Sequence, residues 1–245
     1  MSSSCKIVVP IYKNHLTHNE KISFQNLSKF YNPDKLAIVC PEGLKLDKLV
    51  NHIQTIRFDK VYFKNIDGYN KLMKSIEFYE NFEKYNYILI HQLDTYIFKD
   101  ELERWCSENY DYIGAPWLKS NNPFSSLFQS KKKKSRKPTF LEVGNGGFSL
   151  RKTSTFINFL NNHKDIVDEY SEDPLYKIED VFWSLIAPKY VDFKKPDYLT
   201  AALFAIDRKP KLGFKITKGK LPFGCHGFEK DKTKPFWKSY IENLK

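Results

Sequence analysis

The sequence predicts an α/β domain with a central, mostly parallel sheet flanked by helices. Short β-branched apolar runs recur along the chain, segments with helical spacing lie between them, and the runs end in turns. This alternation is typical of parallel crossover units, whose ligand-binding loops follow the carboxyl ends of the strands. A chain of 245 residues that is 41% hydrophobic can bury one core, so we expect a single domain over residues 1–245.

The first half of the chain alternates regularly. Its expected elements are, in order, a strand over 6–12 (KIVVPIY), a helix through Ile22, Leu27 and Phe30, a strand over 36–43 (LAIVCPEG), a helix over 69–82 and a strand over 85–90. Pro10 ends the first strand in a loop, and the sequence Asn-Pro-Asp at 32–34 breaks the first helix. These elements predict the core of the sheet.

The second half is less regular. Its expected elements are a short helix over 99–105, a strand with a turn over 111–117, a glycine-rich turn over 143–152, a helix over 153–170, an amphipathic helix over 178–187 and a tail over 223–237 that is rich in glycine, histidine, lysine and aromatic residues. Residues 119–138 are polar and contain KKKKSRK. With no hydrophobic face to pack, this stretch is predicted to be a mobile basic loop.

Charge and cysteine content restrict the partners and the compartment. Lys and Arg number 40 against 29 Asp and Glu, a net charge of +11, which favours nucleotides, nucleic acid, phosphorylated lipid or an acidic membrane surface. The four cysteines lack the spacing of a zinc site or a disulfide framework. The N-terminal residues do not have the order of a secretory signal, and apolar runs such as 199–206 are too short to span a bilayer. We expect a cytoplasmic protein, with peripheral membrane contact left open.

Asp94 and His226 are the candidate metal ligands. Asp94 follows the buried strand over 85–90, where an open sheet places its ligands, and it offers a hard oxygen of the kind that Mg²⁺ or Mn²⁺ prefers. A neutral imidazole at His226 could complete such a site. The alternatives are structural: Asp94 could cap Thr95 or the helix near Asp100, and a lone histidine is more often structural.

Two acids, Glu179 and Asp180, open the helix expected over 178–187. One of them could act as a general base on a hydroxyl if the apolar neighbours Phe182 and Trp183 raise its pKa. Acids in a first helical turn also complement the helix dipole, which needs no catalysis. Both interpretations remain open at this point.

Glycines and lysines supply weaker signals. Gly146 and Gly147 could let the backbone approach a sugar or a phosphate closely, although a tight turn needs the same residues. Lys230 and Lys234 could neutralise a diphosphate, although either one alone could be a solvated surface lysine. The run KKKKSRK could bind nucleic acid or anionic lipid, but it has no interleaved aromatic residues and is more often a solvated loop.

Five motifs together resemble a bacterial and viral family of uncharacterised glycosyltransferase-like domains: HQLDTYIF, DYIGAPW, VGNGGFSLR, EDVFW and CHGFEK. The likeness runs from about Ile7 to Trp237. It implies a GT-A-like, Rossmann-like domain that uses a nucleotide sugar. In the GT-A class, an Asp-any-Asp motif at a strand end holds a divalent ion on the donor diphosphate. This chain has Gln92 in place of the first acid and keeps Asp94.

The resemblance implies several donor contacts. Pro10 and Tyr12 fall where the loop after the first strand receives the nucleotide base. Asn70 and Lys71 are placed to reach the diphosphate, as is Gln92 at the strand end.

Later motifs resemble the rest of such a site. Gly146 and Gly147 are similar to the turn that lines the donor sugar and the acceptor. His226 resembles the late histidine that completes a Mn²⁺ or Mg²⁺ site. Lys230 or Lys234 resembles the lysine that contacts phosphate.

The acidic motif resembles the one that supplies the base in inverting members, where the second acid, here Asp180, carries the role. The implied reaction is a single displacement with inversion, from a donor such as a UDP-sugar to a glycan or lipid-linked hydroxyl. The competing hypotheses are a nucleic-acid-binding protein, an inactive sugar-binding domain and a retaining transferase.

Overall fold

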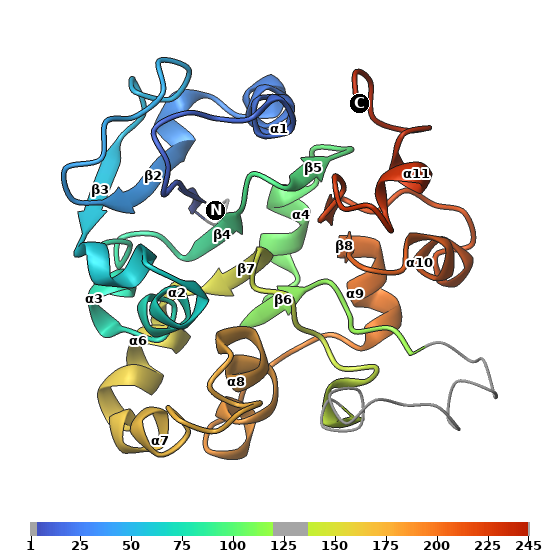
Figure 1. Ribbon diagram of the computed structural model, residues 1–245. Helices are drawn as coiled ribbons and strands as arrows, with labels where there is room; N and C mark the ends of the chain where they lie inside the picture. The colour runs from blue at the N-terminus through green and yellow to red at the C-terminus, as the bar shows by residue number, and fades with distance from the viewer. Residues whose placement is uncertain (1–3, 120–136, 245) are drawn as a thin grey trace.

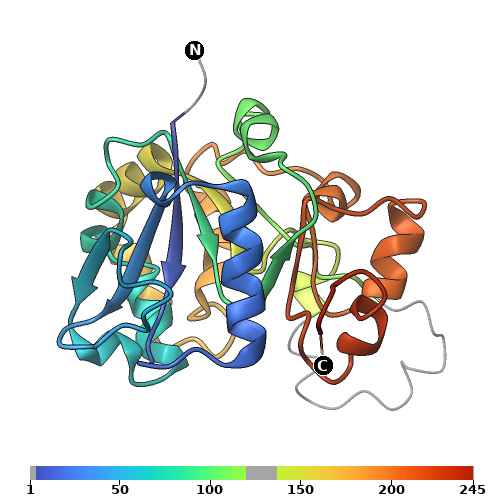
Figure 2. The ribbon, with the colours of Figure 1, turned by 90° about the horizontal axis from the view of Figure 1, so that it is seen from above.

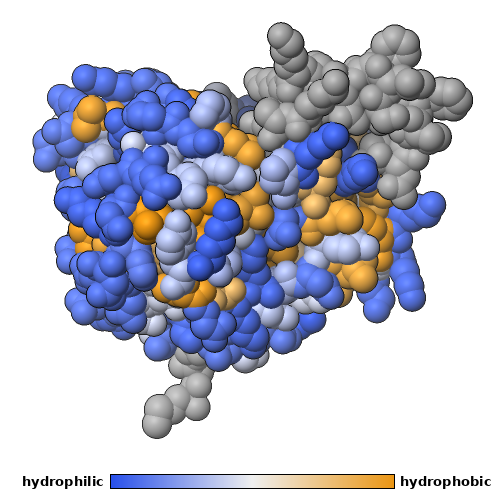
Figure 3. All heavy atoms as spheres, turned by 90° about the horizontal axis from the view of Figure 1, so that it is seen from below, coloured by the Kyte–Doolittle hydropathy of each residue, from blue (hydrophilic) through white to orange (hydrophobic). Residues whose placement is uncertain are grey.

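The computed structural model describes residues 4–119 and 137–244. Nearly all of the basic loop expected over 119–138 therefore lies outside the described residues. None of the helices in the described ranges is long and apolar enough to cross a membrane. Seen from below, the surface is mainly hydrophilic, with apolar patches between the polar residues (Figure 3).

A six-stranded sheet forms the centre of the molecule, with the strand order β3-β2-β1-β4-β7-β6 (Figure 1). Its strands are β1 (Cys5–Pro10), β2 (Leu36–Pro41), β3 (Thr55–Phe58), β4 (Tyr87–His91), β6 (Tyr112–Gly114) and β7 (Phe148–Lys152). β1 to β4 are mutually parallel, and β7 is antiparallel to both of its neighbours. The expected α/β fold with a mostly parallel sheet is confirmed.

Helices cover both faces of this sheet (Figures 1 and 2). These helices are α1 (His18–Phe30), α2 (Ile66–Leu72), α3 (Ile76–Glu80), α4 (Leu102–Ser107), α6 (Thr153–Asn162), α7 (Lys164–Glu169), α8 (Glu179–Leu185) and α9 (Tyr198–Phe204); α10 (Pro210–Ile216) and α11 (Lys234–Trp237) lie elsewhere, against the second sheet. Alternate strand residues point to opposite faces. Ile7 and Leu89 pack with α1, α4 and α9, whereas Val8 and Ile88 pack with α2, α3, α6 and α8.

A second, three-stranded sheet lies beyond the end of β4. It has the order β5-β9-β8, formed by β5 (Thr95–Ile97), β8 (Ala205–Ile206) and β9 (Gly224–His226). β5 and β9 are antiparallel, with Thr95 opposite His226. α10 and α11 complete a small apolar cluster around these strands, with Trp237 fully buried in it. The tail of the chain is thereby fixed beside the carboxyl end of the central strand.

Two expected helices are each divided in the structure. The helix expected over 69–82 is α2 followed by α3. α2 ends at Leu72, and Ser75 is the N-cap of α3, where its Oγ accepts the Phe78 N–H at 3.3 Å. The helix expected over 153–170 is divided at His163 into α6 and α7. β3 has two residues of intermediate exposure and one exposed residue, so its apolar pattern is weak in the sequence.

Candidate active site

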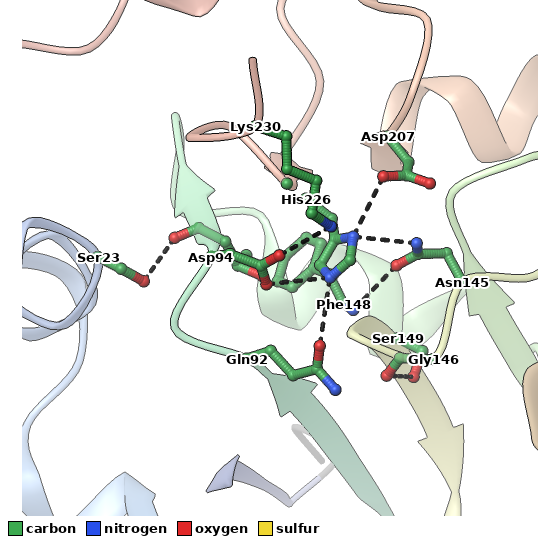
Figure 4. A network of polar contacts seen from close by, with 12 residues as sticks. Ser23, Gln92, Asp94, Asn145, Gly146, Phe148, Ser149, Asp207, His226 and Lys230 are labelled. Carbon is green, nitrogen blue, oxygen red and sulfur yellow. Dashed lines mark hydrogen bonds and ion pairs between the residues drawn. The ribbon is translucent and has the colours of Figure 1, made fainter. Parts of the chain in front are cut away.

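Asp94 lies three residues after the end of β4, and its carboxylate carries two cationic partners (Figure 4). One oxygen lies 3.0 Å from His226 Nε2, and the other lies 3.0 Å from Lys230 Nζ. The Asp94 carbonyl also accepts the Gly227 N–H at 2.7 Å. The structure thus brings together Asp94, His226 and Lys230, which are far apart in the sequence, through the pairing of β5 with β9.

His226 lies between two carboxylates (Figure 4). Its Nδ1 is 3.2 Å from Asp207 Oδ1, on the side of the ring opposite to Asp94, and 3.1 Å from Asn145 Nδ2. Its Nε2 is also 3.3 Å from Gln92 Oε1. Sequence reasoning missed Asp207. The available signal was its position directly after the apolar run 199–206, where β8 ends.

This arrangement fixes the charge of the imidazole. Burial lowers the pKa of His226, but the carboxylates of Asp94 and Asp207 outweigh burial and raise the pKa to about 9. Burial likewise raises the pKa of Asp94, but His226 and Lys230 outweigh it and hold the pKa well below its usual range. At neutral pH the cluster therefore contains an imidazolium, an ammonium and two carboxylates.

The glycine-rich turn makes room for four neighbouring side chains. A Cβ at Gly147 would overlap His226 Nε2 and lie 2.6 Å from Gln92 Oε1, and a Cβ at Gly146 would overlap the carboxylate of Glu179. A Cβ at Gly144 would overlap the indole ring of Trp117. Because such overlaps cannot relax without moving a site residue, close approach explains these glycines better than turn geometry.

Glu179 and Asp180 begin α8 and point to different surroundings. Glu179 lies 3.0 Å from Arg151 Nη2, with side-chain exposures of 5% and 0%, and its backbone N–H donates to Asn70 Oδ1 at 3.1 Å. Arg151 also donates to the Tyr79 hydroxyl at 2.8 Å. Burial, opposed by Arg151, raises the pKa of Glu179 to about 7. Glu179 is therefore closed off within the protein.

Asp180 differs in being half-buried, with one carboxylate oxygen accepting the Gly146 N–H at 3.3 Å. Its other oxygen, Oδ1, is buried without a hydrogen-bond partner among the described residues. Burial raises its pKa, and the nearby charge of Asp207 acts in the same direction. Asp180 thus contacts the glycine-rich turn and lies close enough to Asp207 for the two charges to interact.

A cleft of about 520 Å³ opens beside Asp94. Pro10, Tyr12 and Gln92 line it, and the Tyr12 side chain at its mouth is 62% exposed. Asn70 and Lys71 instead line a separate hollow on the other side of α2. Lys234 begins α11, and the lysine that contacts Asp94 is Lys230.

The donor atoms around His226 Nε2 suit a divalent cation. Asp94 Oδ1, Gln92 Oε1 and the ring nitrogen are a carboxylate oxygen, an amide oxygen and an imidazole, which are ligand types that Mg²⁺ and Mn²⁺ accept. No group of three or more His, Cys, Asp or Glu side chains with this capacity occurs in the part of the chain that the structure describes. The amide of Gln92 makes the set less anionic, and the Nε2 proton must leave before the ring can bind a metal.

The fold has known counterparts among glycosyltransferases. The structure of the galactosyltransferase LgtC with donor and acceptor sugar analogues has a TM-score of 0.52 and 12% identity, covering 90% of this chain and 86% of that one. For mouse xyloside xylosyltransferase 1 the values are 0.51 and 10%, covering 91% and 97%. The bifunctional glycosyltransferase WbbM gives 0.52 and 12%, covering 95% of this chain and 47% of that one. At these identities the likeness shows the fold, which is GT-A.

No curated protein matches the sequence. A family profile does match it, over residues 52–226, which is more than half of the 245 residues and runs from β3 to the histidine of the charged cluster. The chain therefore belongs to the family described as "protein of unknown function (DUF5672)".

Proposed function

We propose that this protein is a glycosyltransferase that moves a sugar from a UDP-sugar to a hydroxyl of a glycan or lipid-linked acceptor. The observation that carries the proposal is the charged cluster of Asp94, His226 and Lys230 at the carboxyl end of β4, beside a cleft of about 520 Å³ in a GT-A fold. In open α/β sheets, ligands bind at the carboxyl ends of the strands. The solved counterparts that share this fold include LgtC, whose structure holds donor and acceptor sugar analogues.

In this proposal the mouth of the cleft binds the nucleobase of the donor, and the charged cluster binds its diphosphate. Pro10 and the exposed ring of Tyr12 offer an apolar surface for the nucleobase at the mouth of the cleft. The ammonium of Lys230 and the imidazolium of His226 both contact Asp94, which lines the cleft, and from there they attract the diphosphate and stabilise the charge that grows as it leaves. Asn70 and Lys71, which line another hollow, are no longer assigned to the donor.

A divalent ion, if bound, would be held by Asp94, Gln92 and His226 and would supply Lewis-acid stabilisation of the diphosphate. The chain's own residues account for the remaining steps. Asp180, with a raised pKa and an unpartnered oxygen, takes the proton of the acceptor hydroxyl as that oxygen attacks the anomeric carbon. The bond from this carbon to the diphosphate breaks on the opposite face, so the configuration inverts. Glu179 is held by Arg151 and has no part in this step.

Titration calorimetry with a panel of UDP- and GDP-sugars, with and without Mn²⁺, tests the proposal. We expect UDP-sugars to bind, and we expect a mixture of wild-type protein, donor and water to release UDP slowly. NMR of the product anomer then tests inversion. Binding without any turnover would indicate an inactive sugar-binding domain, and no binding of any nucleotide sugar would overturn the proposal.

We also propose that the enzyme works in the cytoplasm, against the anionic inner face of a membrane. The net charge of +11 supports this, because each basic residue near such a surface contributes about 1 kcal/mol of attraction. Flotation with vesicles that contain phosphatidylserine should recover the protein, and neutral vesicles should not. Equal recovery from both would contradict the proposal.

A further inference from the structure

A second hollow, of about 190 Å³, lies on the other side of His226 from the donor cleft. Asp94 lines the cleft, and Asp207 lines this hollow. The imidazole of His226 contacts both carboxylates, at 3.0 Å and 3.2 Å (Figure 4). The hollow therefore opens next to the reacting end of the proposed donor site, which is where an acceptor must approach.

Trp117 forms a rigid aromatic wall of this hollow. Its indole packs on Gly144, where any side chain would overlap the ring. Its backbone accepts the Leu141 N–H at 3.0 Å and donates to the Glu142 carbonyl at 2.9 Å. Of the four tryptophans, the other three are fully buried, whereas Trp117 is partly exposed. A fixed, partly exposed aromatic ring suits the apolar face of a sugar ring, whose hydroxyls need polar partners.

Polar groups stand beside this wall. Asp207 offers carboxylate oxygens to sugar hydroxyls. Arg208 lies 3.5 Å from Asp207 Oδ2 through its Nε, and its side chain is 69% exposed, so most of its guanidinium faces solvent. A guanidinium has five donors in a planar fork that matches a carboxylate or a phosphate. The hollow thus combines an aromatic face with a site for one anionic group.

We infer that the acceptor is an anionic sugar, whose ring lies on Trp117 and whose carboxylate or phosphate pairs with Arg208. This inference rests on the proposed function, since it names the acceptor of the same site. A volume of about 190 Å³ is below the range of about 300–1,000 Å³ that is usual for drug-sized ligands, so the hollow takes a single ring.

Acrylamide quenching of tryptophan fluorescence tests the hollow without requiring any turnover. Because Trp117 is the partly exposed tryptophan, it should dominate quenching in the wild type, and Trp117→Phe should remove most of it. Methyl β-glucuronoside and glucose 6-phosphate should protect the fluorescence, at concentrations roughly tenfold to a hundredfold lower than methyl β-glucoside. Which of the two anionic probes protects better decides between a carboxylate and a phosphate.

Arg208→Gln should remove the advantage of the anionic probes and bring their protection to the level of the glucoside. Arg104→Gln is the matched control, because it removes the same charge from a half-exposed arginine on α4 and should change nothing. Equal protection by charged and neutral probes in the wild type, or an unchanged advantage in Arg208→Gln, would overturn the inference.

Steady-state kinetics tests the acceptor separately from the proposed transferase activity. With a UDP-sugar that is turned over, Arg208→Gln should raise KM for an anionic acceptor while the dissociation constant of UDP stays the same. Turnover of donor without protection by anionic sugars would leave the proposed function standing and reject the acceptor. Protection by anionic sugars in a protein that binds no nucleotide sugar would reject the transferase instead.

Discussion

The two sides of the glycine-rich turn carry charge clusters of similar composition but opposite accessibility. On one side, Arg151 and Glu179 form an ion pair with side-chain exposures of 0% and 5%. On the other side, Asp94 and Lys230 are 19% and 53% exposed, and Asp94 lines the cleft of about 520 Å³. A sealed pair holds its elements in register, whereas an open cluster has charge available for a ligand. Accessibility, more than residue type, distinguishes the two charge clusters of this molecule.

The same lesson holds for two neighbours in the sequence. Glu179 and Asp180 are adjacent at the start of α8, yet Glu179 faces Arg151 and Asp180 faces the turn beside Asp207. Because successive helical residues point about 100° apart, one residue can be buried in the core while the next reaches the site. The predictions below test this division.

The largest effect is expected for Asp180→Asn. If Asp180 is the general base, the transfer rate with saturating donor and acceptor should fall by about 10²–10⁴. The free energy of unfolding and the dissociation constant of UDP should change little. Rapid-mixing kinetics measures the rate, and Glu172→Gln, an exposed acid, is the matched control. A rate within a few-fold of the wild type would remove Asp180 from the mechanism.

Arg151→Met should act on stability first. The variant leaves Glu179 buried without its cation, so the free energy of unfolding should fall by about 3–5 kcal/mol, as measured by urea denaturation. The double variant Arg151→Met/Glu179→Met removes both charges and should recover a large part of the loss. If the double variant is no more stable than the single one, the loss does not come from leaving the charge of Glu179 buried without a partner.

The open cluster should give a smaller effect that depends on pH. The pKa of His226 is raised to about 9 in the folded protein, above the value of about 6.5 expected for an unfolded chain. The folded state therefore binds the proton more tightly, and the stabilisation is complete below pH 6.5 and is lost as the pH rises through 9. Between pH 7 and 9.5 the free energy of unfolding should fall by roughly 1–3 kcal/mol.

Urea denaturation in the presence of a chelator measures this change. His226→Gln cannot titrate, so its stability should vary less across the same window. The raised pKa of Glu179, about 7, adds a loss that is mostly complete before this window begins. An equal decline in wild type and variant would show that the imidazole is not held between Asp94 and Asp207.

The parallel half of the sheet was predictable because its strands are buried on both faces. Residues 36–41 are apolar throughout, and β4 is fully buried, so each stands out from its flanking turns. The positions of Asp94 and Gln92 followed from the rule that ligands bind at strand ends. His226 and Lys230 were candidates both from their residue types and from the resemblance; the structure places both within 3.0 Å of Asp94, and their roles stay predictions.

Other features depend on tertiary contacts that leave little trace in the sequence. Arg151 is fully buried in a β-strand. From the sequence alone an arginine is predicted to be exposed, and only the ion pair with Glu179 explains its burial. The place of Asp207 beside His226 depends on the pairing of β8 with β9. Because β8 has only two residues, the sequence gives little sign of that strand. Asn70 and Lys71 were expected to contact the diphosphate because they precede β4 in the sequence. In the structure they lie on the face of α2 that is turned away from the cleft, and they line a separate hollow with Lys177.

The pairing of Thr95 with His226 has a consequence for synthesis on the ribosome. The parallel strands β1 to β4 can form while the chain is still growing, whereas the imidazole that faces Asp94 arrives 132 positions later than that carboxylate, counted from 94 to 226. A nascent chain arrested before β9 would thus present a folded core in which the carboxylate of Asp94 lacks both of its cationic partners, His226 and Lys230. Acid should stabilise such an intermediate relative to its unfolded chain, because protonation removes the uncompensated charge, and the intermediate should depend more on chaperones than the finished protein.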